Sequence, residues 1–153
     1  MKTIMTYNTN THSIDIYPRE IQPTFSITIE TMEIVIDYNS VKMVYIQGFL
    51  PLVKAQRVAI DLPLAEAGDY FFSDIDMTSI RKFGVYELSE LLPASESYFS
   101  EYRVLFDQKR GIIQTGAELT SDDRLIKIND NIIIGMDARL AIKCIYMMPD
   151  RFL

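Results

Sequence analysis

Apolar and polar residues alternate along both ends of this chain, and that alternation limits its fold more than any other feature of the sequence. In TFSITIE, Phe25, Ile27 and Ile29 alternate with polar residues, as in a strand with one buried and one solvated face. MEIVIDY repeats the alternation, and Asn39-Ser40 then supplies turn chemistry before VKMVYIQGF. The pattern predicts strands over most of residues 24–60.

The C-terminal part of the chain has the same character. RLIKINDNIIIGMDARLAIKCIYMM predicts three short strands with turns at residues 129–131 and 137–139, because Asn and Asp tolerate the positive φ angles of tight turns. YRVLFDQKRGIIQTG predicts a hairpin with Gly111 in a bulged loop. Strands are therefore expected over most of residues 98–148.

The middle of the chain has weaker patterns. DIDMTSIRKF (74–83) and VYELSELL (85–92) each predict a helical turn or two, and Pro93 would end the second. Helix is expected mainly within residues 62–96. The fold class predicted is mainly β, with α+β as the alternative: a single antiparallel β domain over residues 1–153, of the sandwich or curved-sheet type, with one or two short central helices and a mobile N-terminus over residues 1–12.

The net charge of −6 disfavours nucleic acid and anionic membranes as partners, because phosphate contacts need clustered Lys and Arg. No apolar run approaches the roughly 20 residues that span a bilayer, and the first residues lack the apolar core of a signal peptide. A cytoplasmic location is expected.

Residues suited to catalysis or metal binding are scarce. His12 is the only histidine and Cys144 the only cysteine, whereas a zinc site usually needs about three or four ligands at defined spacing. The six glycines match no nucleotide-binding motif. Asp74 and Asp76 form an Asp-x-Asp pair that could hold Mg²⁺ or Ca²⁺, but such pairs are common on acidic surfaces. We therefore expect no enzymatic activity, no metal and no cofactor.

The net negative charge is concentrated in one part of the chain. Between residues 58 and 102 there are nine acids and two bases, whereas the rest has twelve acids and thirteen bases. Within this part, residues 61–76 (DLPLAEAGDYFFSDID) place five acids and no base around three consecutive aromatic residues; we call them the acidic segment. Its aromatic residues either belong to the core beside a solvated acidic loop or form, with the acids, a surface for a partner.

A partner surface would explain why the charges are not mixed in sign, because like charges weaken a fold unless a partner neutralises them. Carboxylates steer a basic partner and aromatic side chains anchor it, and a nuclease is the obvious basic partner because its cleft holds phosphates. Phe71 is expected to face away from its two neighbours, as strand geometry requires. The predicted partner-binding residues are Asp61, Glu66, Asp69, Tyr70, Phe72, Asp74, Asp76, Glu87 and Glu90.

A small, acidic chain without secretion signal, cofactor motif or catalytic cluster resembles the immunity proteins that protect bacteria from their own contact-dependent or polymorphic toxins. The stretch INDNIIIGMDARLAIKCIYMMP, a β-meander followed by a proline, is also similar to the close of several such proteins. The resemblance implies an inhibitor that binds and blocks a basic, nuclease-type toxin. It assigns no role to individual residues, because immunity proteins occur on many folds.

Two other classes of protein stay open. One is a structural or assembly subunit of a phage or secretion apparatus, in which exposed strand edges pair with further copies. The other is a small-ligand-binding β domain or enzyme. For this class, the run YIQGFLPLV, interrupted by Gly48 and Pro51, would line the mouth of a pocket, although an edge bulge explains the run equally well.

Overall fold

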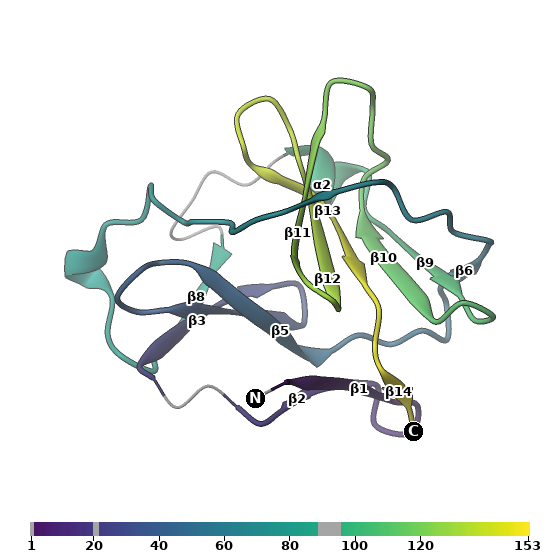
Figure 1. Cartoon of the computed structure of the whole chain (residues 1–153), viewed down its shortest axis with the longest axis horizontal. Helices are drawn as coiled ribbons and strands as arrows, with labels where there is room; N and C mark the ends of the chain where they lie inside the picture. The colour runs from purple at the N-terminus through teal and green to yellow at the C-terminus, as the bar shows by residue number, and fades with distance from the viewer. Residues whose placement is uncertain (1, 20–21, 89–95) are drawn as a thin grey trace.

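Two β-sheets make up most of this protein (Figure 1). The computed structural model describes residues 2–19, 22–88 and 96–153. Each sheet has seven strands, and the two pack together in a sandwich-like arrangement around a shared apolar core. Among the described residues there is one short α-helix, α2 (Glu96–Ser100), and one 3-10 turn, η1 (Met77–Ser79). The predicted mainly β fold is confirmed.

The first sheet has the strand order β14-β1-β2-β5-β4-β3-β8. Its five central strands pair antiparallel, whereas the edge strands β14 and β8 run parallel to their neighbours β1 and β3. The strands are β1 (Ile4–Asn8), β2 (Ser13–Tyr17), β3 (Thr24–Ile29), β4 (Met32–Asp37), β5 (Met43–Phe49), β8 (Val85–Glu87) and β14 (Arg151–Phe152).

The second sheet has the strand order β6-β9-β10-β13-β12-β11-β7. Again five antiparallel strands are flanked by two parallel edge strands. The strands are β6 (Gln56–Arg57), β7 (Glu66–Ala67), β9 (Arg103–Asp107), β10 (Ile112–Gly116), β11 (Arg124–Asn129), β12 (Ile132–Met136) and β13 (Ile142–Met147).

The central strands of the two sheets repeat one topology. The order β1-β2-β5-β4-β3 becomes β9-β10-β13-β12-β11 when each strand is replaced by one starting 99 or 100 residues later, as Ile4 and Arg103 or Thr24 and Arg124 show. The turns repeat as well, since the β1–β2 and β9–β10 turns both end on a residue with positive φ, His12 at 59° and Gly111 at 68°. The chain is therefore built from two halves of the same topology.

The halves exchange their edge strands. β6 follows β5 in the chain but pairs with β9, while β14 follows β13 but pairs with β1. β7 and β8 also come from the connection between the halves, and they cap β11 and β3 respectively. Both edges of each sheet are thus closed by very short strands, which leave little backbone exposed for pairing with another chain.

Between β6 and β7 the chain crosses the outer face of the second sheet, in front of β11 and β13 in Figure 1. Ile60, in the middle of this crossing, packs with a second cluster of buried residues that includes Ile133, Cys144 and Tyr146. β12 and β13 are consequently buried on both faces. This burial explains why IIIGM, and IKCIYM apart from the ion-paired Lys143, are apolar without alternating.

The alternation in the first sheet has the predicted effect. Phe25, Ile27 and Ile29 of β3 are all buried in the core between the sheets. The hairpin predicted over residues 102–116 is present as β9 and β10, and the two predicted turns of the C-terminal meander lie between β11, β12 and β13.

Two stretches differ from the sequence-based expectation. Residues 1–12, expected to be mobile, contain the paired strand β1, in which Met5 and Tyr7 are buried. VYELSELL, expected to be helical, begins with the strand β8, which gains a row of backbone hydrogen bonds by pairing with β3; residues 89–95 lie outside the described residues. The helical turn expected in DIDMTSIRKF is present as η1. No helix within the described ranges is long and apolar enough to cross a membrane.

Candidate functional site

The three aromatic residues of the acidic segment alternate in direction. Phe71 forms an isolated antiparallel bridge with Lys42, and the flanking backbone bonds run from Met43 N to Tyr70 O (2.8 Å) and from Phe72 N to Val41 O (2.9 Å). This strand-like pairing turns Phe72 into the core, where its side chain is 3% exposed, and turns Phe71 outward, where it is 51% exposed. The expected difference between Phe71 and its neighbours is confirmed.

Tyr70 fastens the acidic segment to the second sheet. Its hydroxyl donates a hydrogen bond of 2.6 Å to Leu140 O in the β12–β13 turn, and its ring packs edge-on against Phe72 at 4.9 Å. Burial, together with the charges of Asp137 and Asp74, raises the pKa of Tyr70 to about 12. Of the two rings predicted to anchor a partner, Phe72 therefore lies in the core and Tyr70 is half-buried against it, whereas Phe71 is the exposed ring.

Two of the predicted acids have partners within the chain. Asp61 Oδ1 lies 2.8 Å from Arg110 Nη1, which also donates to Ile60 O at 2.9 Å and so holds the start of the acidic segment against the β9–β10 turn. Asp76 caps η1, accepting hydrogen bonds from the hydroxyl and backbone N–H of Thr78, and these bonds lower the pKa of the Asp76 carboxyl.

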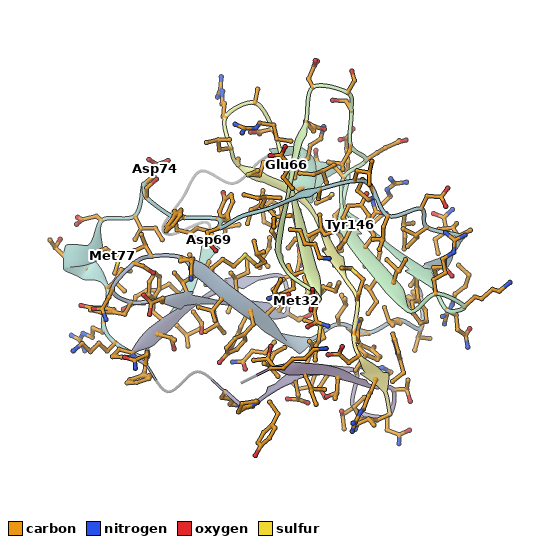
Figure 2. All side chains as sticks on the ribbon, in the orientation of Figure 1. Met32, Glu66, Asp69, Asp74, Met77 and Tyr146 are labelled. Carbon is orange, nitrogen blue, oxygen red and sulfur yellow. The ribbon has the colours of Figure 1, made fainter. Side chains whose placement is uncertain are left out.

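Glu66, Asp69 and Asp74 are exposed along the acidic segment (Figure 2). Glu66 lies in the edge strand β7 of the second sheet. Glu87 is exposed in β8, at the edge of the first sheet. None of these four carboxylates forms an ion pair within the described part of the chain. Glu90 lies outside the described residues.

Exposed apolar side chains lie among these acids, a feature that the sequence did not reveal. Leu64, two residues before Glu66, is fully exposed. The large hydrophobic side chains exposed between residues 61 and 87 are Leu62, Leu64, Phe71, Phe83 and Val85. The surface of the acidic segment therefore mixes exposed charged and exposed apolar side chains, as many protein-binding surfaces do.

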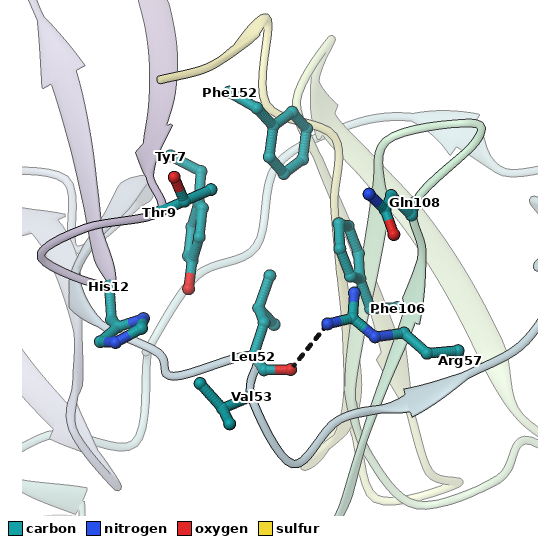
Figure 3. A pocket seen from close by; sticks show the side chains of 9 residues that line it. All are labelled: Tyr7, Thr9, His12, Leu52, Val53, Arg57, Phe106, Gln108 and Phe152. Atoms are coloured by element: carbon teal, nitrogen blue, oxygen red, sulfur yellow. Dashed lines mark hydrogen bonds between the residues drawn. The ribbon is translucent and has the colours of Figure 1, made fainter.

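A pocket of about 410 Å³ lies at the other end of the second sheet, where the exchanged edge strands meet β1 and β9 (Figure 3). Three aromatic rings line it, with Phe152 5.7 Å from both Tyr7 and Phe106. Leu52 and Val53 add an aliphatic wall. These two residues end the run YIQGFLPLV, which the sequence offered as the mouth of a pocket.

Polar side chains complete this wall. The guanidinium carbon of Arg57 lies 4.8 Å from the centre of the Phe106 ring, and Arg57 Nη2 donates to Leu52 O at 3.4 Å. Thr9, His12 and Gln108 line the same space. His12, expected in a solvated terminal run, is partly buried here.

The pocket follows from the repeated topology. Tyr7 and Phe106 occupy equivalent positions of β1 and β9, and each faces an exchanged edge strand, Phe152 pairing with Tyr7 and Arg57 with Phe106. The two halves thus contribute matching positions, but one supplies a ring and the other a cation. We call this space the exchange pocket. Its main residues carry no local sequence signal, because each depends on a strand from the other half.

The single thiol and one further ion pair lie in the interior of the protein. Cys144 is fully buried, and burial raises the pKa of its thiol to about 12. Lys143 Nζ pairs with Asp123 Oδ2 at 2.7 Å, with both side chains buried. Across residues 2–19, 22–88 and 96–153, no three His, Cys, Asp or Glu side chains gather as a metal site.

No protein-family model matches this chain, and no curated protein matches it either.

Proposed function

We propose that this chain is an acidic protein-binding module, an immunity protein or inhibitor that binds and blocks a basic, nuclease-type toxin through its acidic segment. The observation that carries the proposal is the combination of unpaired, exposed carboxylates with exposed apolar side chains on one continuous stretch of chain.

The acidic segment is held in place at several points. Arg110 pairs with Asp61 at its start, β7 pairs with β11, and the Tyr70 hydroxyl bonds Leu140 O. Phe72 is buried in the core just beyond. A surface that is already ordered loses little conformational entropy on binding, so more of the contact energy remains as affinity.

The surface suits a basic partner in two respects. Glu66, Asp69 and Asp74 supply negative charge that accelerates the approach of a cationic protein. Leu64 and Phe71 supply apolar area that is exposed to water until a partner covers it. These five residues form the centre of the proposed surface; of the two aromatic residues in the predicted set, Phe72 is buried and Tyr70 is half-buried.

The test is a charge-reversed variant, Glu66→Lys, Asp69→Lys and Asp74→Lys together, used beside the parent as bait in the native host. The parent should retain a basic protein and inhibit its nuclease activity, whereas the variant should associate more slowly and lose the salt dependence of association. The matched control carries the same charge change at exposed acids elsewhere, Glu30→Lys, Glu101→Lys and Asp122→Lys, and should bind like the parent. A reversed variant that binds as fast and as tightly as the parent, at low and high salt, would sink the proposal.

The assembly-subunit alternative gains no support from the sheet edges. The described edge strands β6, β7, β8 and β14 contain two or three residues each, too few for a long ladder with another copy. Size-exclusion chromatography distinguishes the two classes, since an assembly subunit should form defined oligomers by itself.

A further inference from the structure

We infer that the exchange pocket is a binding site for a small amphipathic carboxylate, an organic acid whose apolar body contacts Phe106 and Phe152 and whose carboxylate pairs with Arg57. This site is separate from the acidic segment and goes beyond the proposed protein-binding function.

The size of the pocket suits a small molecule. Its volume of about 410 Å³ lies within the range of roughly 300–1,000 Å³ that small-molecule sites occupy. Leu52 and Val53 stand opposite the rings, so that apolar surface faces the space from more than one side (Figure 3).

The aromatic wall presents carbon rather than polar atoms. The Tyr7 hydroxyl is already used, because it donates a 2.6 Å hydrogen bond to Leu50 O. Phe152 remains partly exposed although its ring packs near both Tyr7 and Phe106. An apolar body placed here would remove this surface from water, which is the main source of affinity for such ligands.

The charge of the pocket selects an anion. Among the described residues that line it there is no carboxylate, although the protein as a whole carries a net charge of −6. Within the described ranges the Arg57 side chain makes no ion pair, and its one hydrogen bond, to Leu52 O, is long at 3.4 Å. Since a guanidinium has five N–H donors in a planar fork, most of them remain available to a carboxylate.

The surroundings add to this preference. Three exposed bases are adjacent in sequence to residues that line the pocket: Lys54, Lys109 and Arg151. Asp107 is the one acidic side chain adjacent in sequence to lining residues, and it lies 3.8 Å from Arg110 Nε. Basic side chains therefore outnumber acidic ones next to the lining residues in sequence, and such an excess attracts small anions.

A cationic ligand is the chemical alternative, because aromatic rings also attract cations. Here the face of Phe106 is already covered by the Arg57 guanidinium, whose carbon lies 4.8 Å from the ring centre. A second cation would be repelled by Arg57, whereas the carboxylate of an anionic ligand would be attracted by the guanidinium. The position of Arg57 over Phe106 therefore favours a ligand with a negative charge.

The test compares octanoate with 1-octanol, which has the same chain length without the charge, by isothermal titration calorimetry. The parent should bind octanoate at least about tenfold more tightly than 1-octanol, because a hydrogen bond to a charged group is worth at least that factor. Arg57→Gln should remove this preference while leaving 1-octanol binding unchanged. Arg124→Gln, a matched change at an exposed arginine of β11, should behave like the parent.

Two further variants complete the experiment. Val53→Trp places a large ring at an exposed position of the wall and should weaken both ligands by filling the space. The charge-reversed variant of the acidic segment should bind octanoate like the parent, so failure of one proposal is distinguishable from failure of the other. Absence of octanoate binding to the folded parent, or an Arg57→Gln variant that keeps the preference for octanoate, would overturn the inference.

Discussion

Replacing Phe72 with alanine should cost much more stability than replacing its neighbour Phe71. Phe72 is 3% exposed and packs edge-on against Tyr70 at 4.9 Å, so its truncation should leave a cavity and lower the free energy of unfolding by about 3–5 kcal/mol. Phe71 is 51% exposed, so it loses about half of a full burial term, or about 1 kcal/mol, without leaving a cavity.

Urea unfolding of the two variants, analysed with a common slope, measures this difference. In a thermal scan, a loss of 3–5 kcal/mol corresponds to a fall in Tm of about 6–20 °C for a chain of this length, while the Phe71→Ala variant should fall by only about 2–4 °C. Partner binding should show the reverse order, with Phe71→Ala the weaker binder. Equal losses of stability, or a larger loss for Phe71→Ala, would refute the placement of these two rings.

Buried groups in the second sheet give two further expected outcomes. Lys143→Met leaves the buried Asp123 carboxylate without its cation, so urea unfolding should show a loss of about 3–5 kcal/mol. Burial opposes ionisation of Asp123, but the hydrogen bonds from Lys143 and Thr120 outweigh it and lower the pKa of the Asp123 carboxyl below 3.8. The stabilisation that ionised Asp123 contributes is therefore present above pH 3.8. It should disappear in an acid titration as the pH falls through the folded-state pKa of Asp123. Cys144 should react with iodoacetamide at pH 8 only after unfolding, because the thiol is buried and its pKa is raised to about 12; rapid labelling of the native protein would contradict its burial.

The strands that alternate were predictable because one face of each meets the core. Phe25, Ile27 and Ile29 carry that signal in their own spacing. The exchanged edge strands were not predictable, because β6, β7 and β14 have two residues each and exist only through pairing with distant strands. The exchange pocket depends on these pairings, so Arg57 and Phe152 could not be connected from sequence.

The sequence does not reveal that the two halves share one topology, and the reason is physical. Aligned by the register of the strand pairs, the halves share an identical residue at only four positions of the strands. All four are isoleucines that pack in the shared core: Ile14 with Ile113, Ile27 with Ile126, Ile34 with Ile134, and Ile46 with Ile145. Outside the core, many side chains satisfy the same strand geometry, so the topology can persist while the sequence diverges.

The charge of the acidic segment was predictable from the sequence, but which of its side chains face the core was not. Strand geometry requires Phe71 to face away from Tyr70 and Phe72, yet it does not say which side is the core. The bridge between Phe71 and Lys42 decides that question, and it joins residues from different parts of the chain. The exposure of Leu64 likewise depends on how the segment crosses the second sheet.

The exchange of edge strands also determines when each sheet can be completed during synthesis of the chain. Tyr7 of β1 pairs with Phe152 of β14, so the first sheet cannot be completed until the last strand has left the ribosome. At translation rates of about 5–20 residues per second, the hundred or so residues that follow β5 take about 5–20 s to synthesise. Throughout that interval a folded first half would present the bare edge of β1 to neighbouring nascent chains. The arrangement that closes the sheets of the finished protein therefore leaves a strand edge open to aggregation during synthesis.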